Sequence, residues 1–293
     1  VNFFLFGSLL RNLGSHTKIV LKEKLFRMNE VILLAKTALE NLVGSMNKLR
    51  SFLHFLLFAT VVPLATTKAH DTRVYEMRTY YANEGKLDDL IARFRDHTTG
   101  LFAKHGIENV GYWVPKNNPD EKLIYIIAFP SRLDQESMWK SFQEDPEWKA
   151  AAKASSKNGR LIEKIEAVFI QTTEYSMPLK KIQASPERLF ELRTYICKDG
   201  MRRHLDARFR DHTIGLFDKH GIENIAYFHP MADQDGGTST LIYIVAHESQ
   251  GGREEAFGNQ REDEDWKLAA AASRERAGGG MVIEGGVISE LIV

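Results

Sequence analysis

Between Val74 and Tyr81 the side chains alternate between two faces, which is the pattern of a strand buried on one side. One face carries Tyr75, Met77 and Thr79, and the other carries Glu76, Arg78 and Tyr80. Apolar residues then recur at helical spacing over residues 86–105, and Gly106 offers the left-handed conformation that ends a helix. The sequence therefore predicts a half-buried strand followed by an amphipathic helix.

Three further apolar segments predict strands, at residues 109–114, 123–129 and 167–173. The second of these, LIYIIAF, is apolar throughout, so we expect it near the centre of a sheet. Helices are predicted over residues 133–143 and from Pro146 onward, since proline fits the first turn of a helix. The resulting order β-α-β-β-α-β is typical of a ferredoxin-like unit, whose antiparallel sheet carries both helices on one face.

The whole pattern occurs twice. ARFRDHTTGLFAKHGIEN at residues 92–109 returns as ARFRDHTIGLFDKHGIEN at residues 207–224, and EMRTY returns as ELRTY. A bare sheet face must be buried, and the second copy offers a matching face. The sequence thus predicts an α+β protein of two tandem ferredoxin-like domains, residues 73–179 and 188–293, joined by the linker Tyr175 to Pro186. We expect the two domains to close into one intrachain pseudo-dimeric α/β barrel.

Residues 46–69 have the three parts of a secretory signal: basic residues, an apolar core over 52–64, and small residues before a cut near 67–69. The core is too short to span a bilayer comfortably, so removal is expected, which leaves no stable membrane anchor. Because such signals act from the N-terminus, translation is expected to start at Met46, and residues 1–45 are interpreted as a non-native upstream extension. The predicted localisation is periplasmic or extracellular. The alternative is a genuine amphipathic extension followed by a retained membrane helix.

Charge and cysteine content narrow the classes of function. The chain has 39 basic and 39 acidic residues, so it lacks the basic excess of a nucleic-acid-binding surface. Its single cysteine, Cys197, leaves no intrachain disulfide and no cysteine-rich metal site. The sequence also contains no G-x-S-x-G elbow, no P-loop and no H-E-x-x-H motif. Neither a nucleic-acid partner nor a metal site is therefore predicted.

Three segments of the repeated unit are informative together: EMRTYYANEGKLDDLIARFRDHTTGLFAKHGIENVGYWVP, DPEWKAA and FIQTTEYSMPL. They resemble the NIPSNAP family, and the resemblance implies membership of the dimeric α/β barrel superfamily. It covers residues 73–179 fully and residues 188–293 except for the ending, where the second copy stops at ISELIV. Eukaryotic members are linked to vesicle or mitochondrial protein interactions. A secretory signal in place of a mitochondrial transit peptide is typical of a bacterial exported member.

The polar face of each first strand provides the first set of candidate site residues. The set is Glu76, Arg78, Tyr80, Glu191, Arg193 and Tyr195. If the apolar face of the strand packs on the helices, these side chains face the barrel interior, where unpaired charges are costly. They would then form ion pairs that dock the two sheets, or alternatively a catalytic acid and an anion clamp.

One edge of each first helix provides the second set. Its residues are Arg93, His97 and Lys104 in the first copy, and Arg208, His212 and Lys219 in the second. Steps of four and seven residues return to nearly the same side of a helix, so this edge could hold an anionic ligand, with histidine as a proton carrier. The alternative is a solvated edge on which Asp96 and Asp211 pair locally. His105 and His220 are predicted to cap the same helices.

Three functions remain open, the last of which is a structural role as a signalling or trafficking partner with no pocket ligand. The first is a binding module whose barrel-interior pocket takes a small ligand, or whose surface takes a protein partner. The second is an enzyme of the barrel group, either a cofactor-independent monooxygenase or isomerase, or a haem-dependent oxidoreductase. In the enzyme hypothesis His97 or His212 would be the base, and Arg78 or Arg193 would hold a developing anion. No cofactor is predicted, haem is kept as an alternative, and further homo-oligomerisation is left open.

Overall fold

The computed structural model divides into two compact units, residues 1–68 and Ala69–Val293, which are described separately. The described residues are 24, 26–34, 71–179 and 188–293. In the first unit, residues 26–34 form an exposed helix. The predicted signal segment 46–69, most of the predicted extension 1–45 and most of the linker lie outside the described residues. No helix among the described residues is long and apolar enough to cross a membrane.

In the first copy, a central strand β1 pairs with a neighbour on each side. The strands are β1 Val74–Ala82, β2 Glu108–Trp113, β3 Lys122–Phe129 and β4 Ile162–Thr172. All pairings are antiparallel, in the order β2-β3-β1-β4. The helical elements are α4 Leu87–Arg93, η2 Phe94–Thr98, α5 Thr99–Lys104, α6 Arg132–Glu144 and α7 Pro146–Ser155.

The second copy repeats this arrangement in the order β6-β7-β5-β8. Its strands are β5 Leu189–Cys197, β6 Glu223–Pro230, β7 Thr240–His247 and β8 Val282–Ile292. Its helical elements are α8 Arg202–Arg208, η3 Phe209–Thr213, α9 Ile214–Lys219, α10 Gln250–Glu262 and α11 Glu264–Ala277. Both copies are therefore the ferredoxin-like unit that the sequence predicts.

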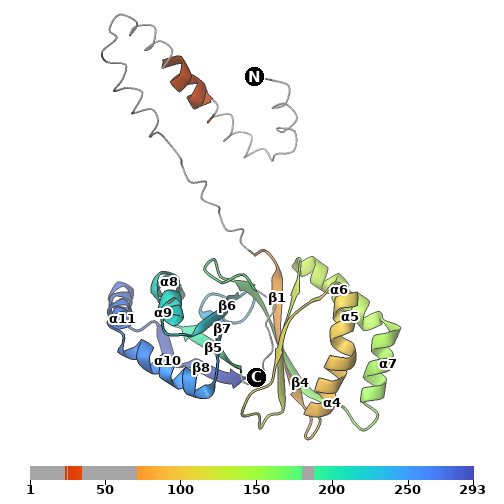
Figure 1. Cartoon of the computed structure of the whole chain (residues 1–293). Helices are drawn as coiled ribbons and strands as arrows, with labels where there is room; N and C mark the ends of the chain where they lie inside the picture. The colour runs from red at the N-terminus through yellow and green to blue at the C-terminus, as the bar shows by residue number, and fades with distance from the viewer. Residues whose placement is uncertain (1–23, 25, 35–70, 180–187) are drawn as a thin grey trace, which may run out of the picture. The chain divides into compact units, whose positions relative to one another are not determined.

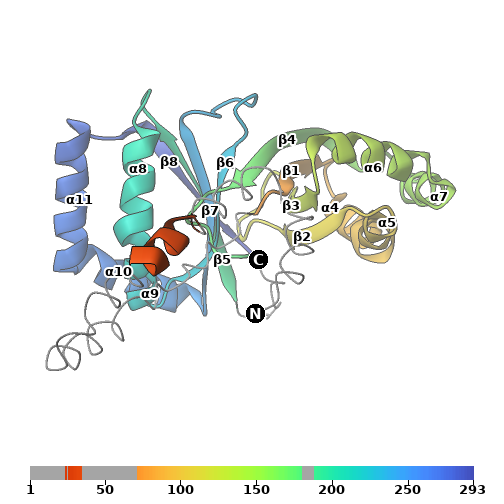
Figure 2. The same ribbon diagram turned by 90° about the horizontal axis from the view of Figure 1, so that it is seen from above.

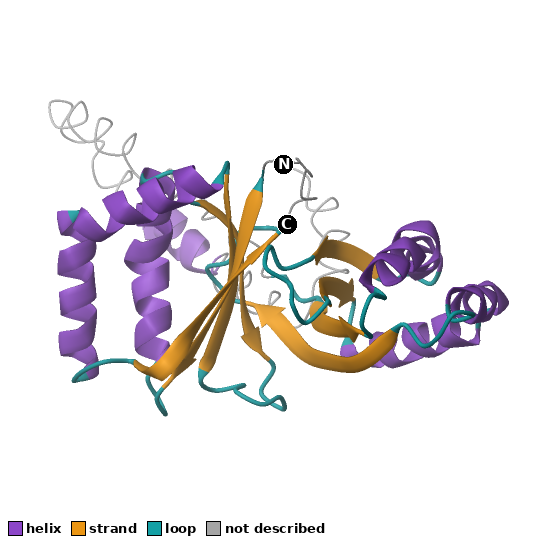
Figure 3. Ribbon diagram, turned by 90° about the horizontal axis from the view of Figure 1, so that it is seen from below, coloured by secondary structure: helices purple, strands orange, loops and turns teal. Residues whose placement is uncertain are grey.

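The two four-stranded halves join at both ends. β4 pairs with β6, with Ile170 opposite Pro230. At the other end Val114 and Val293 exchange backbone hydrogen bonds of 3.0 and 2.9 Å, just beyond β2 and β8. Figures 1 and 2 show helices on two outer sides with strands between them, and Figure 3 shows the same layers from below. The predicted intrachain pseudo-dimeric α/β barrel is confirmed.

Three apolar clusters hold this fold together. One fills the barrel interior with residues from both copies, among them Tyr75, Trp113, Phe190 and Phe228. The other two lie between each half of the sheet and its own helices. Close packing of apolar side chains in the interior excludes water and fixes the two halves against each other.

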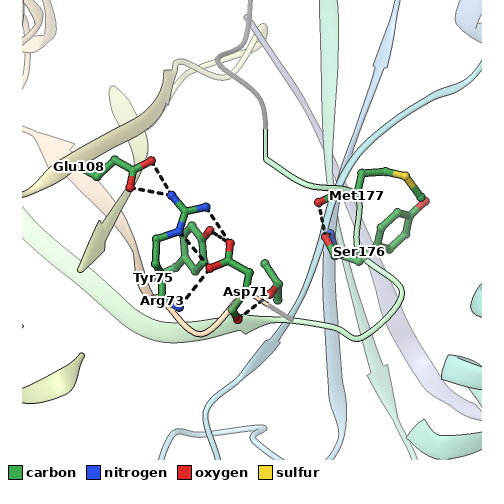
Figure 4. A network of polar contacts seen from close by, with 8 residues as sticks. Asp71, Arg73, Tyr75, Glu108, Ser176 and Met177 are labelled. Atoms are coloured by element: carbon green, nitrogen blue, oxygen red, sulfur yellow. Dashed lines mark hydrogen bonds and ion pairs between the residues drawn. The ribbon is translucent and has the colours of Figure 1, made fainter. Parts of the chain in front are cut away.

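The start of β1 is tied to β2, beyond the intervening β3, by a polar network (Figure 4). Arg73 pairs with Asp71 at 2.7 Å and with Glu108 of β2 at 2.6 Å, and Tyr75 donates to Asp71. Burial alone would raise the pKa of Asp71, but the hydrogen bonds from Arg73 and Tyr75 outweigh it and lower that pKa to about 2. Figure 4 also shows Ser176 donating to the carbonyl oxygen of Met177.

The long first helix of each copy contains one wide turn. The segment FRDHT forms a π-helical turn, η2 in the first copy and η3 in the second. The hydroxyl of Thr98 donates to the carbonyl oxygen of Arg93 at 3.2 Å, and Thr213 does the same to Arg208 at 3.2 Å. Periodicity predicts a continuous α-helix here, so the extra residue is a difference from expectation. Such turns are frequent at functional sites.

Candidate ligand-binding site

The polar face of the first strands points toward the helices, which corrects the predicted orientation. Tyr75, on the other face, lies inside the barrel with its ring 5.4 Å from that of Phe228. Tyr80 packs under the helices, 5.7 Å from Phe94. The two halves of the sheet bury their apolar faces against each other, so the polar faces are left to the helices. Glu76, Arg78, Tyr80, Glu191, Arg193 and Tyr195 therefore do not line a barrel-interior pocket.

A cavity of about 300 Å³ lies on this helix side of the second copy, among β5, α8, η3, α10 and α11. Its basic lining residues are Arg193, Arg208, Arg253 and Arg261. Its aromatic lining residues are Tyr195, Phe209, Phe217, Phe257 and Trp266. Thr213, Glu254 and Gln260 complete the lining. Three of the predicted candidates, Arg193, Tyr195 and Arg208, thus come together, but in one copy and on the outer side of the sheet.

Two of the four arginines pair with Glu191, which has no exposed surface and whose single negative charge offsets one of their two positive charges. Its carboxylate accepts hydrogen bonds from Arg193 at 2.6 Å, from Arg253 at 2.6 and 2.9 Å, and from Ser289. His247 lies 3.5 Å from the same carboxylate. Burial alone would raise the pKa of Glu191, but these contacts outweigh it and hold the pKa well below its usual range. Glu191 is therefore ionised at neutral pH and fixes one wall of the cavity.

Arg208 is different, because no acidic partner lies beside it among the described residues. Its side chain leaves α8 immediately before the wide turn and is 9% exposed. The guanidinium lies 5.3 Å from the ring centroid of Trp266, and its Nε has no hydrogen-bond partner in the described part of the chain. Burial lowers the pKa of Arg208, yet arginine remains protonated in proteins. The cavity wall thus carries a buried cation that no described carboxylate pairs with.

Gln260 of α10 adds an unsatisfied donor. Its side chain is 3% exposed, and its Nε2 has no partner in the described part of the chain. Buried amide groups are normally hydrogen-bonded, because desolvation without a partner costs free energy. Gln260 and Arg208 both line the same cavity. Together they form a donor set for a negatively charged or strongly accepting group.

The equivalent space in the first copy is occupied by aromatic side chains. Phe142 of α6 is 2% exposed, and its ring lies 4.7 Å from Phe102 and 4.5 Å from Trp148. Trp139 packs 5.6 Å from Phe142 and 4.7 Å from the guanidinium of Arg78. The duplication has therefore become asymmetric at this place.

The remaining helix-edge candidates do not join the cavity. His97 and His212 are exposed, and neither contributes to its lining. Lys104 and Lys219 are also exposed and pair with carboxylates at the start of α7 and α11. The wide turn begins directly after Arg93 and contains His97, so these two side chains do not share one side as they would in an α-helix. Arg93 and Arg208 are therefore buried, while the histidines face solvent. The predicted single cationic edge is wrong, and the predicted local pairs of Asp96 and Asp211 are present.

His105 and His220 act between helices. The ring of His105 lies 2.7 Å from the carboxylate of Asp145, and His220 lies 2.6 Å from Asp263. These aspartates are the N-caps of α7 and α11. The histidines thus bind the cap of a neighbouring helix, not the carbonyls of their own. Within the described residues, no group of His, Cys, Asp and Glu is arranged to hold a metal ion.

Two ferredoxin-like halves that close one antiparallel sheet define the dimeric α/β barrel class. The NIPSNAP family model matches residues 75–177 and again residues 190–281. The chain belongs to the NIPSNAP family.

Solved structures agree with this fold. A protein from Lactobacillus acidophilus, provisionally named a monooxygenase, is 13% identical with a TM-score of 0.50, covering 76% of this chain and 94% of that chain. An anthrone oxidase-like protein is 14% identical with a TM-score of 0.50, covering 76% and 91%. An uncharacterised NIPSNAP domain protein from Burkholderia xenovorans is 21% identical with a TM-score of 0.29, covering 33% and 90%. The first two likenesses show a shared fold alone. A comparison with curated proteins found no match.

Proposed function

We propose that this protein binds a small organic anion in the cavity of its second copy. The observation that carries the proposal is Arg208, a buried guanidinium on the cavity wall without an acidic partner among the described residues. Taking an unpaired charge out of water costs several kcal/mol. A bound anion would supply the missing partner and would be held strongly for the same reason.

The other charges of the cavity favour this assignment. Glu191 pairs with both Arg193 and Arg253, so these two arginines shape the wall and together keep one net positive charge. Arg208, Gln260 and the exposed Arg261 remain to meet a ligand. A volume of about 300 Å³ is at the small end of the range for small-molecule sites, which begins at roughly 300 Å³. The site therefore suits a compact anion.

This proposal keeps the small-ligand hypothesis and moves its site from the barrel interior to the helix side. The enzyme alternative gains less support, because its assigned bases, His97 and His212, lie outside the cavity lining. The lining contains one carboxylate, Glu254, and no histidine. Export remains a proposal that rests on the signal-like segment 46–69.

The test is ligand-induced thermal stabilisation of the full chain. The probes are benzoate, cyclohexanecarboxylate, succinate and inorganic phosphate, each compared with sodium chloride at equal ionic strength. A ligand that binds only the folded state raises the melting temperature. We expect at least one probe to do so in the wild type and in Arg93→Met, but not in Arg208→Met. Arg93 is the matched control, since it is buried over Trp148 at 5.3 Å in the first copy.

Two outcomes would overturn the proposal. In one, none of the anions stabilises the wild type. In the other, the stabilisation survives in Arg208→Met.

A further inference from the structure

The two copies place equivalent residues on α6 and α10, as their caps show. Ser131 and Ser249 are the N-caps of these helices, and Asp145 and Asp263 cap the helices that follow. Counting from the caps, Gln260 stands where the first copy has Phe142. In the same way Phe257 replaces Trp139, and Ala256 replaces Met138. Each replacement shortens or narrows a side chain, and together they account for the open space.

The walls around this space are the same in both copies. In the first copy the ring of Phe142 lies between Phe102 and Trp148. Their counterparts Phe217 and Trp266 line the cavity of the second copy. These two rings therefore flank the cavity as Phe102 and Trp148 flank Phe142. An aromatic ring offers the flat shape that such walls accommodate, and offset or tilted ring pairs add stabilisation.

From these relationships we infer that the ligand is a planar aromatic carboxylate, bound once per chain, whose ring takes the place that Phe142 fills in the first copy. The inference rests on the proposed function and specifies its ligand. The ring would pack between Phe217 and Trp266. Its carboxylate would accept from Arg208 and Gln260, two of the three lining residues with an unsatisfied donor among the described residues. The third is Arg193, whose guanidinium already pairs with Glu191. A planar guanidinium matches the two oxygens of a carboxylate.

The first copy cannot take the same ligand, because its own side chain occupies the position. Arg93 is buried there as Arg208 is, so the arginine alone does not make a site. The difference between the copies lies in α6 and α10. Phe142 thus fills this space in the first copy, so only the second copy can bind the ligand. The expected stoichiometry is therefore one ligand per chain.

Isothermal titration of the full chain with benzoate, cyclohexanecarboxylate and benzamide separates the features of the ligand. Benzoate is flat and charged, cyclohexanecarboxylate is charged but not flat, and benzamide is flat but neutral. Aromatic pairs contribute about 0.5–1.5 kcal/mol beyond area, which corresponds to roughly two- to twelvefold in affinity. We expect benzoate to bind once per chain and about two- to twelvefold more tightly than cyclohexanecarboxylate, and benzamide to bind at least tenfold more weakly than benzoate.

Variants at the exchanged position test the location. Gln260→Phe should abolish benzoate binding by restoring the ring of the first copy. Phe142→Gln, combined with Trp139→Phe, should create a second equivalent. Should that double variant fail to fold, Gln260→Phe against Asn259→Phe still decides the point, since Asn259 is exposed on the same helix and outside the cavity lining, so that Asn259→Phe should retain binding.

The outcomes separate this inference from the proposed function. Equal or tighter Arg208-dependent binding of cyclohexanecarboxylate would overturn the aromatic class and leave anion binding intact. Two equivalents in the wild type would overturn the filled first copy. An absence of binding by any of the anions would overturn both.

Discussion

Arg208 lies 5.3 Å from the ring centroid of Trp266, the same distance that separates Arg93 from Trp148 in the other copy. The duplication has preserved this pair on both sides of the barrel. The two environments differ in what faces the pair, a packed phenylalanine in one copy and an unsatisfied glutamine in the other. The cavity of the second copy therefore depends on the differences between α6 and α10.

Replacing Arg208 by methionine should stabilise the ligand-free protein. The variant loses a cation–π contact of about 1 kcal/mol, but methionine keeps a comparable sulfur–aromatic contact with Trp266. It also removes a buried, uncompensated charge, whose penalty is several kcal/mol. The desolvation penalty that is removed exceeds the contact energy that is lost, so we expect the free energy of unfolding to rise by about 1 kcal/mol. Urea unfolding monitored by tryptophan fluorescence measures it.

Arg93→Met is the matched control for this stability effect. It should show a similar rise, because Arg93 is equally buried and equally without an acidic partner among the described residues. Only Arg208→Met should lose anion binding. A loss of about 2 kcal/mol or more in Arg208→Met would instead identify Arg208 as a structural residue with satisfied contacts.

The sequence predicts the fold well, because the patterns that identify each strand and helix are local and occur in both copies. Alternation at Val74 to Tyr81 and the apolar run LIYIIAF identify strands, and their order identifies the ferredoxin-like unit. Which face of the first strand turns inward was predicted incorrectly. Both faces carry a tyrosine, Tyr75 or Tyr80, so hydrophobicity alone does not decide between them. The decision depends on the opposing sheet, which no local pattern contains.

The sequence predicts the candidate site only in part, because the prediction rests on residues that the two copies share, whereas the cavity depends on residues that differ. Arg193, Tyr195 and Arg208 are shared between the copies, and all three line the cavity. Gln260 and Arg253, which open and shape the cavity, are not shared between the copies, so only the differences between the copies point to them. The wide turn at FRDHT also escaped prediction, because one inserted residue changes the helical phase without changing composition.

The segment just after β2 pairs with the end of β8, and this seam closes the barrel. We expect the seam to be essential for stability. Ile292, at the end of β8, has no exposed surface and lies opposite Pro115, whereas Ile288 on the same strand is 51% exposed. We expect Ile292→Ala to lower the free energy of unfolding by about 3 kcal/mol, as for other buried isoleucines. Ile288→Ala should change it by about 0.5 kcal/mol or less. Equal effects in urea unfolding would show that the seam contributes nothing beyond the two separate halves.

Glu191 should make stability depend on pH, in a direction that follows from its lowered pKa. The unfolded pKa of glutamate is about 4.3, and the folded pKa of Glu191 lies below it. Its stabilising contribution is therefore complete above about pH 4.3 and is lost as the pH falls toward the folded value. Glu191→Gln leaves Arg193 and Arg253 without their shared anion, so we expect a loss of about 3 kcal/mol at neutral pH.

The difference between the wild type and Glu191→Gln should then shrink as the pH is lowered from about 5 to 2, because in this range the unfolded carboxylate takes up a proton more readily than the folded one. Glu76→Gln is the matched control. Glu76 accepts from Arg78 alone among the described residues, so its effect at neutral pH should be smaller. Urea unfolding at a series of pH values measures both variants. A difference that stays constant across this range would mean that the pKa of Glu191 is the same in the folded and unfolded states.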